Sequence, residues 1–165
     1  QLNNFGFTPK KPVIMSWSSG FEELIQLDPA ARENLIVGSN YYYTIDNPEN
    51  KKFVEAYKKK FKGVPPGYAG AAGYGLMKMT LLGMQKSGST EPQKVITALE
   101  EHKGKNFVGD FEIRGRNHQT VRPFFVLQTK KKNEMKNQYD MAEVVDVSST
   151  EQPKNINMCK DIGSF

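Results

Sequence analysis

Cysteine is almost absent from this sequence: Cys159 is the single one in 165 residues. One thiol excludes a small domain held together by several disulfides, and it leaves open whether Cys159 stays reduced or pairs with a cysteine outside this chain. Long apolar runs are also missing, since the longest are residues 13–15, 35–37 and 124–127. A membrane-spanning helix needs about 20 apolar residues. The sequence therefore predicts no transmembrane helix.

The side chains that usually carry catalysis are scarce or wrongly spaced. His102 and His118 are the only histidines, and neither has a second histidine or a cysteine at metal-ligand spacing. The glycines of residues 67–73 do not form a G-x-G-x-x-G pattern, and residues 16–20 lack the G-x-S-x-G spacing. No pair of carboxylates is marked out for acid–base chemistry. We interpret the chain as a non-enzyme that uses no metal and no cofactor.

The net charge is +5, with an isoelectric point near 9.2. A basic balance permits contact with nucleic acid or an anionic membrane. The lysines, however, gather in two runs, residues 58–60 on the polar face of an expected helix and residues 130–132 in an expected turn. Aromatic residues do not interleave with these runs as they do in strands that bind RNA. We therefore expect no nucleic-acid partner.

The first forty residues have the pattern of strand, helix and strand. Residues 13–15 and 35–37 are short apolar runs, and the second strand is expected to run toward the tyrosines at 41–43. Between them, Ser19 and Glu22 have the spacing of a capping box at the start of a helix. This order predicts an α/β protein in which the two strands are adjacent and parallel.

Three further helices and three strands are expected after residue 47. The helices are expected over residues 48–61, over 68–86 and from 92 onward, the last behind a capping box at Thr90. The helix over 68–86 is apolar nearly all round, which predicts a buried, central position. Alternating patterns predict strands over residues 111–114, 122–129 and 143–147, and residues 148–165 read as a polar surface tail.

Three groups of motifs carry a resemblance to a known family. They are FVEAYKKKF at 53–61 with PPGYA at 65–69; GYGL at 73–76 with KSGST at 86–90 and VITALE at 95–100; and GDFEIR at 109–114 with NHQ at 117–119 and PFFV at 123–126. Their order and spacing resemble the C-terminal half of type 1 periplasmic solute-binding proteins, in particular the branched-chain amino-acid receptors of ABC importers. The resemblance covers residues 12–147.

The resemblance implies an incomplete three-layer α/β fold, with pieces of two lobes joined by crossover strands. Residues 1–42 and 123–147 would belong to the second lobe and residues 43–122 to the first. The missing part would be N-terminal. The apolar side chains that would then lack full cover are Met77, Leu81, Met84, Val95 and Leu99. An exposed apolar patch of this kind predicts self-association of the isolated chain, or packing beside the remainder of a longer parent.

The resemblance also implies a function, which is to bind a small carboxylate or amino-acid-like ligand between two lobes and deliver it to an inner-membrane ABC permease. The protein would then be periplasmic or extracellular, and membrane-associated through the importer. The ligand-binding residues we expect are Trp17, Ser18, Ser19, Tyr42 and Tyr68. Two alternatives stay open from the sequence, a sensory ligand-binding domain of the same fold and an α/β enzyme or regulatory nucleotide-binding domain.

Where amino-acid-binding relatives place an acid for the ligand ammonium, this chain has Trp17 and Ser18. The departure favours an aromatic or other carboxylate over a free α-amino acid. Trp17 would supply an apolar wall, and the serines lead into a helix N-terminus that offers amide donors.

Overall fold

The computed structural model describes residues 5–6, 11, 13–15, 20–115 and 117–151. The chain divides into two compact units. Unit 1 consists of Gln1–Ala71 and Phe124–Ser148, and unit 2 consists of Ala72–Pro123 and Ser149–Phe165. The chain passes from one unit to the other after residues 71, 123 and 148. The assignment of residues 1–42 and 43–122 to different lobes of a whole protein stays a prediction.

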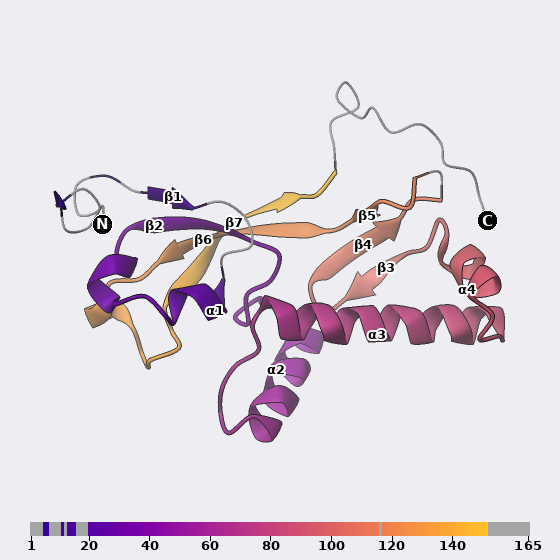
Figure 1. The fold of residues 1–165 in the computed structure, drawn as a ribbon, viewed down its shortest axis with the longest axis horizontal. Coiled ribbons are helices and arrows are strands. Elements are labelled where there is room, and N and C mark those ends of the chain that lie inside the picture. The colour runs from indigo at the N-terminus through magenta and orange to yellow at the C-terminus, as the bar shows by residue number, and fades with distance from the viewer. Residues whose placement is uncertain (1–4, 7–10, 12, 16–19, 116, 152–165) are drawn as a thin grey trace. The chain divides into compact units, whose positions relative to one another are not determined.

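Unit 1 is built on a four-stranded mixed sheet with the order β1-β2-β6-β7 (Figure 1). The strands are β1 (Val13–Met15), β2 (Leu35–Ser39), β6 (Pro123–Thr129) and β7 (Ala142–Ser149). Strands β1 and β2 are parallel, with Val13 opposite Leu35 and Met15 opposite Val37. The predicted adjacent parallel pair is therefore confirmed. Strand β6 then pairs antiparallel with β2.

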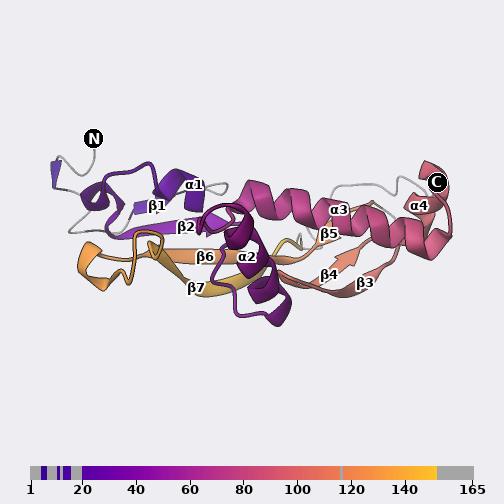
Figure 2. The same cartoon turned by 90° about the horizontal axis from the view of Figure 1, so that it is seen from below.

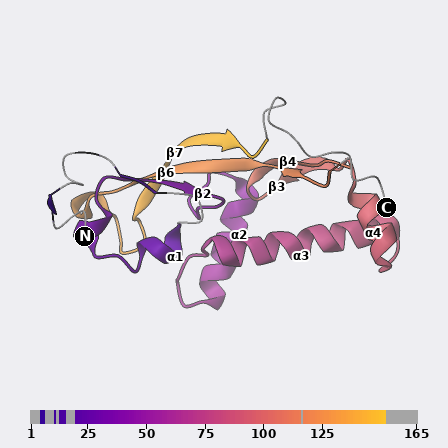
Figure 3. The same cartoon turned by 45° about the horizontal axis from the view of Figure 1, so that its top comes forward.

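The connection from β1 to β2 contains α1 (Phe21–Leu24) and a short 3-10 helix, η2 (Pro29–Arg32). Figure 3 shows α1 lying on one face of the sheet. The predicted capping box is wrong in its residues. The N-cap of α1 is Gly20, and Glu23 rather than Glu22 folds back onto its N–H. Glu22 instead accepts a hydrogen bond from a different backbone donor, the N–H of Tyr68.

Helix α2 (Pro48–Lys60) begins where the sequence predicts. The Asn47 side chain accepts hydrogen bonds from the N–H groups of Glu49 and Asn50, and Pro48 takes the first helical position. The helix turns Phe53 and Val54 into the core and leaves most of its lysines exposed.

The core of unit 1 is well covered. Its large apolar side chains at 1% exposure or less are Leu24, Val37, Tyr42, Leu127 and Met141. Alternate residues of β2 and β6 are buried because successive side chains of a strand point to opposite faces. Strand β2 ends at Ser39, short of the predicted tyrosines, because the chain turns there. Strand β7 continues two residues past its predicted end at 147.

Unit 2 contains most of α3 (Tyr68–Ser87), α4 (Pro92–Leu99) and a three-stranded antiparallel sheet, and the views in Figures 1 and 2 agree that α3 runs beside that sheet. The strands are β3 (Lys103–Asn106), β4 (Gly109–Ile113) and β5 (Thr120–Val121). The sequence did not predict β3, because its residues KGKN contain no apolar side chain. These residues become a strand through their antiparallel pairing with β4, in which Lys103 lies opposite Glu112.

Helix α3 is not buried all round, contrary to the expectation from its apolar pattern, whereas the predicted exposure of Met77 and Leu81 is confirmed. Leu76, Met77 and Leu81 are 72%, 60% and 56% exposed. Val95, expected to lack cover, is buried. A Cβ at Gly83 would lie 2.7 Å from Cγ1 of Val95, so α4 packs directly on the backbone of α3. No helix among the described residues is long and apolar enough to cross a membrane.

Candidate functional site

The candidate site of unit 1 lies where the parallel strands β1 and β2 end. Gly20 follows β1, and Ser39 is the last residue of β2. A Cβ added at Gly20 would lie 3.3 Å from Oγ of Ser39 and 3.7 Å from Cδ1 of Tyr68. Three distant segments therefore meet at this edge, which is where ligands bind in open α/β sheets.

Glu22 links this edge to the start of α3. One of its carboxylate oxygens accepts a hydrogen bond from the N–H of Tyr68 at 3.3 Å. A Cβ at Gly67 would lie 1.8 Å from Cδ of Glu22, so the carboxylate occupies the space that a side chain at 67 would need. A negative group at the N-terminus of a long helix is favoured by the helix dipole. Position 67 must therefore be glycine while Glu22 caps α3.

Ser39 and Tyr41 belong to a buried polar network behind the site. The Ser39 hydroxyl donates to the carbonyl oxygen of Tyr41 at 2.8 Å, and the Tyr41 hydroxyl donates to Oδ1 of Asn50 at 2.8 Å. The Asn50 amide in turn donates to the carbonyls of Tyr43 and Ile45. Burial raises the pKa of Tyr41, so its hydroxyl remains a neutral donor. The network fixes the turn that follows β2.

Tyr42 and Tyr43 pack side by side, with ring centroids 5.0 Å apart. Burial, and then the neighbouring Tyr43, raise the pKa of Tyr42. Its hydroxyl is buried with no hydrogen-bond partner among the described residues. The Tyr43 hydroxyl donates to the carbonyl of Tyr139 at 2.8 Å, and burial, followed by the charge of Asp140, raises the pKa of Tyr43 to about 12.

The five predicted ligand-binding residues differ in what the structure says of them. Trp17, Ser18 and Ser19 lie outside the described residues. Tyr68 is half-buried beside Gly20, the residue that directly follows Ser19. Tyr42 is 0% exposed and belongs to the core of unit 1. A role of these five in binding stays a prediction.

Sequence reasoning missed Ser39, Glu22 and Gly67 at this edge. For Gly67 a signal existed, since it directly precedes a helix. In the sequence, Gly67 stands out only as the first glycine of the stretch 67–73, which lacks a G-x-G-x-x-G pattern. The contact with Glu22 spans 45 positions of sequence, which no local pattern reports.

Unit 2 has a hollow of its own, of about 380 Å³, between α3 and the β3–β4 hairpin. Met79, Leu82, Phe107 and Phe111 give it apolar walls. At its rim, Nζ of Lys86 lies 2.6 Å from Nδ1 of His102. Burial, and then the charge of Lys86, lower the pKa of His102, which favours the neutral ring as acceptor. Among the described residues, no group of histidine, cysteine and acidic side chains could hold a metal ion.

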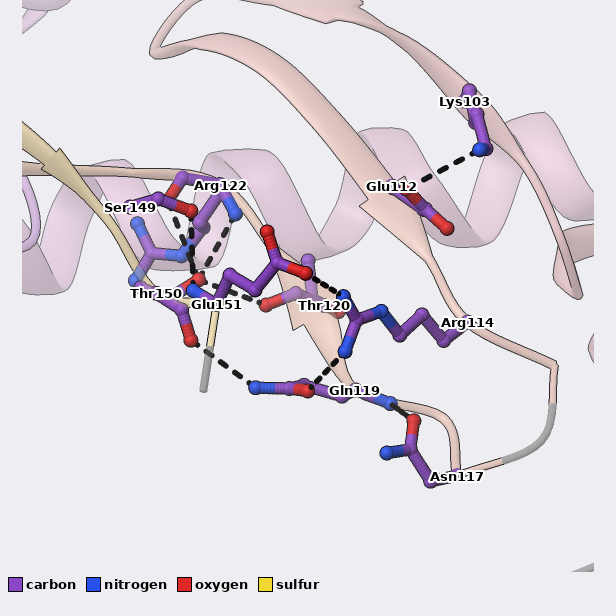
Figure 4. Close-up of polar contacts among 10 residues, drawn as sticks. All are labelled: Lys103, Glu112, Arg114, Asn117, Gln119, Thr120, Arg122, Ser149, Thr150 and Glu151. Carbon is purple, nitrogen blue, oxygen red and sulfur yellow. Dashed lines mark hydrogen bonds and ion pairs between the residues drawn. The ribbon is translucent and has the colours of Figure 1, made fainter. Parts of the chain in front are cut away.

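A polar cluster in unit 2 joins the residues after β7 to the β5 strand (Figure 4). Arg114 donates to Oε1 of Gln119 at 3.2 Å and forms an ion pair with Glu151. The Gln119 amide donates to the carbonyl of Thr150, and Thr150 exchanges backbone and side-chain bonds with Arg122. Each residue drawn in Figure 4 has at least one polar contact with another residue drawn there, which indicates a structural role.

Comparison with solved structures shows the same fold in transport proteins. An amino acid ABC transporter substrate-binding protein from Pseudomonas fluorescens Pf-5 is 27% identical with a TM-score of 0.86, and the match covers 93% of this chain and 41% of that one. The leucine-, isoleucine-, valine-, threonine- and alanine-binding protein from Brucella ovis, in a closed conformation, is 19% identical with a TM-score of 0.73, covering 92% and 40%.

A third structure is the solute-binding protein of an ABC transporter from Rhodopseudomonas palustris BisB5 in complex with 3,4-dihydroxybenzoic acid. It is 20% identical with a TM-score of 0.66, and the match covers 80% of this chain and 35% of that one. At such identities the second and third likenesses show the fold alone. This chain thus spans well under half the length of each of these proteins. No curated protein matches the chain.

The fold is therefore the incomplete α/β fold that the sequence predicts. The model of the family described as "Periplasmic binding protein" matches residues 1–134, which is most of the chain. The chain belongs to the periplasmic binding protein family.

Proposed function

We propose that this chain is part of the solute-binding component of an ABC importer, and that the whole protein holds a small carboxylate-bearing solute between two lobes. The observation that carries the proposal is the family match over residues 1–134. A substrate-binding protein that is 27% identical over a match covering 93% of the chain supports it. The convergence of Gly20, Ser39 and Tyr68 at the ends of β1 and β2 supports it, because this edge is the expected place for a ligand.

The ligand chemistry that fits best is a carboxylate without an α-ammonium group. The acidic side chains at the described edge, Glu22 and Glu23, both accept backbone N–H groups, from Tyr68 and Gly20. A ligand ammonium would have to compete for these carboxylates. By their residue types, Trp17 and Ser18 would instead supply an apolar wall and a hydrogen-bond donor. One structural neighbour holds an aromatic carboxylate, 3,4-dihydroxybenzoic acid.

The partners follow from the same proposal. The loaded protein would deliver its solute to an inner-membrane permease from the periplasmic or extracellular side. Binding and release, rather than turnover, would be its chemistry. The isolated chain would self-associate through the exposed face of α3 or pack beside the rest of its parent, because Leu76, Met77 and Leu81 are uncovered.

The test is a thermal-shift and calorimetric screen of the parent protein that contains this chain. The probes are 3,4-dihydroxybenzoate, benzoate and leucine, and a ligand that binds only the folded state raises the melting temperature. We expect the two benzoates to bind more tightly than leucine. The isolated chain should bind none of them at micromolar concentration. Micromolar binding of leucine by a monomeric isolated chain would contradict the proposal.

A Trp17→Ala variant of the parent tests the site itself. Loss of an anchoring ring costs about 1–3 kcal/mol of binding free energy, which is roughly a tenfold to hundredfold weaker affinity. Tyr57→Ala controls for the loss of an aromatic ring as such, since Tyr57 packs on Phe53 of α2 and on Phe61 just after that helix. Equal affinities of the folded Trp17→Ala variant and the unaltered protein would remove Trp17 from the site.

A further inference from the structure

The C-terminal end of α2 concentrates positive charge. We call residues 58–64 the α2 tip; they contain Lys58, Lys59, Lys60 and Lys62. Residues 56–90 include no aspartate or glutamate at all. Among the described residues, no carboxylate forms an ion pair with any of these four lysines, and Lys59, Lys60 and Lys62 are exposed. Lys58 lies over the ring of Tyr43, 5.5 Å from its centroid.

The tip has a fixed backbone. The N–H of Gly63 donates to the carbonyl of Lys58 at 2.8 Å, the long bond of a Schellman turn, and the N–H of Val64 donates to the carbonyl of Phe61 at 3.0 Å. Lys62 stands in the left-handed region with φ of 52°, at the position where helices most often carry glycine. The turn therefore holds Lys62 in a left-handed backbone conformation, although this conformation is less favourable for lysine than for glycine.

Apolar side chains are exposed among these lysines. Phe61 is 45% exposed and Val64 is 36% exposed. The inner face of the Phe61 ring stacks on Tyr57 at 4.2 Å, so the ring is oriented rather than free. In Figure 1 the tip is the lower end of α2, the end away from the four-stranded sheet of unit 1.

The helix dipole explains only part of this arrangement. Lysines in the last turn of a helix are favoured by its negative end, yet the dipole gives no reason to expose Phe61 and Val64. The other lysine run of the chain offers the contrast. Lys130 forms an ion pair with Asp140 at 2.7 Å, and Glu134 accepts the backbone N–H of Lys131 at 3.0 Å.

We propose that the α2 tip binds the surface of an anionic phospholipid bilayer. Lysines near such a surface are attracted to lipid phosphates, while an exposed aromatic ring and an aliphatic side chain can enter the boundary between headgroups and acyl chains. The footprint is small, so binding is weak, reversible and sensitive to salt. The inference does not depend on which solute the protein binds.

The experiment is cosedimentation of the full chain with vesicles of phosphatidylcholine and phosphatidylglycerol, and with vesicles of phosphatidylcholine alone. We expect binding only to the mixed vesicles, and less of it as salt is raised. Each lysine near the surface strengthens partitioning about fivefold. The double variant Lys59→Gln/Lys60→Gln should therefore bind about 25-fold more weakly.

The matched control is Lys131→Gln/Lys132→Gln, which removes the same charge from the other lysine run and should weaken binding less than about twofold if the tip is the site. Phe61→Ser keeps every charge and should also weaken binding to mixed vesicles. Equal losses in the tip and control variants would show that net charge alone is responsible and would overturn the proposal. Binding to poly-glutamate but not to mixed vesicles would overturn it in favour of an acidic protein partner.

Discussion

Units 1 and 2 differ in how completely they cover their apolar side chains. In unit 1 the core residues Leu24, Val37, Leu127 and Met141 are at most 1% exposed. In unit 2 a helix that is apolar nearly all round leaves Leu76 72% and Leu81 56% exposed. Burial of apolar area is the main source of stability, so the same residue types contribute very differently in the two units.

The difference shows that unit 1 closes a core of its own, whereas α3 has an apolar face that the described residues of unit 2 leave exposed. Monomeric proteins rarely leave such a patch exposed without an interaction to fill it. The proposal that this chain spans only part of its protein accounts for the open face in unit 2 and for the closed core in unit 1.

Matched leucine truncations test the difference in burial between the two units most directly. Leu127→Ala should lower the free energy of unfolding by about 2–5 kcal/mol, because it leaves a cavity in a closed core. Leu81→Ala should lower it by less than about 0.5 kcal/mol, because the side chain is already exposed. Urea unfolding of both variants measures the difference. Similar losses would mean that α3 is covered in solution.

Polar truncations sharpen the same contrast. Asn50 is 0% exposed, accepts the Tyr41 hydroxyl and donates to two carbonyls. Asn50→Ala should lower the free energy of unfolding by about 2–3 kcal/mol, since buried groups lose their partners. Gln119→Ala, in the half-exposed cluster of unit 2, should lower it by only about 0.5–1 kcal/mol. If Gln119→Ala proved the costlier of the two under chemical denaturation, the comparison would be reversed.

Self-association of the isolated chain should be weakened by substitutions in unit 2 rather than by substitutions in unit 1. Leu76→Glu/Leu81→Glu should raise the dissociation constant of any oligomer of the isolated chain at least about tenfold, which corresponds to about 1.4 kcal/mol. Val145→Glu is the control, because Val145 is 52% exposed but lies on β7 of unit 1. Sedimentation velocity over a concentration series measures both. An oligomer disrupted only by Val145→Glu would place the contact on the sheet edge instead.

The smallest expected effect is a pH dependence in unit 1. Burial alone would raise the pKa of Asp140, but hydrogen bonds from Lys130 and Lys136 and the charges of both lysines outweigh it and hold that pKa below its usual value. Because the folded pKa is depressed, the stabilisation is present above the unfolded pKa of about 3.9 and is lost as pH falls through the folded value.

Asp140→Asn should therefore lower the free energy of unfolding by about 1 kcal/mol at neutral pH and leave it unchanged in strong acid. Asp110→Asn removes an exposed partner of Lys105 in unit 2 and should change little at any pH. Urea unfolding between neutral pH and pH 2 gives both profiles. A constant difference between Asp140→Asn and the unaltered chain across that range would contradict the linkage.

Much of unit 1 could be predicted from sequence because its signals are local. The apolar runs at 13–15 and 35–37 indicated β1 and β2, and Asn47 with Pro48 indicated the start of α2. Strand β3 could not be predicted, since KGKN becomes a strand only through its pairing with β4. The burial of α3 was predicted wrongly, because apolar periodicity reports which face could be covered and not whether a neighbour covers it.

The site was predictable only in part. Tyr68 does lie beside Gly20, next to the predicted serines in the chain. The contact of Glu22 with Gly67 and the position of Ser39 depend on three segments meeting, and tertiary contacts of this kind leave no mark in a local pattern.

The contact between Glu22 and Gly67 has a consequence for how the sequence can change over time. A methyl group at position 67 would lie 1.8 Å from the Glu22 carboxyl carbon, so alanine at 67 displaces the acid from the start of α3. Once position 22 is a short residue, the same alanine meets no carboxylate. We therefore expect the two positions, 45 residues apart, to be coupled: Gly67→Ala would cost α3 its Glu22 cap, but would cost little once position 22 carries a short side chain.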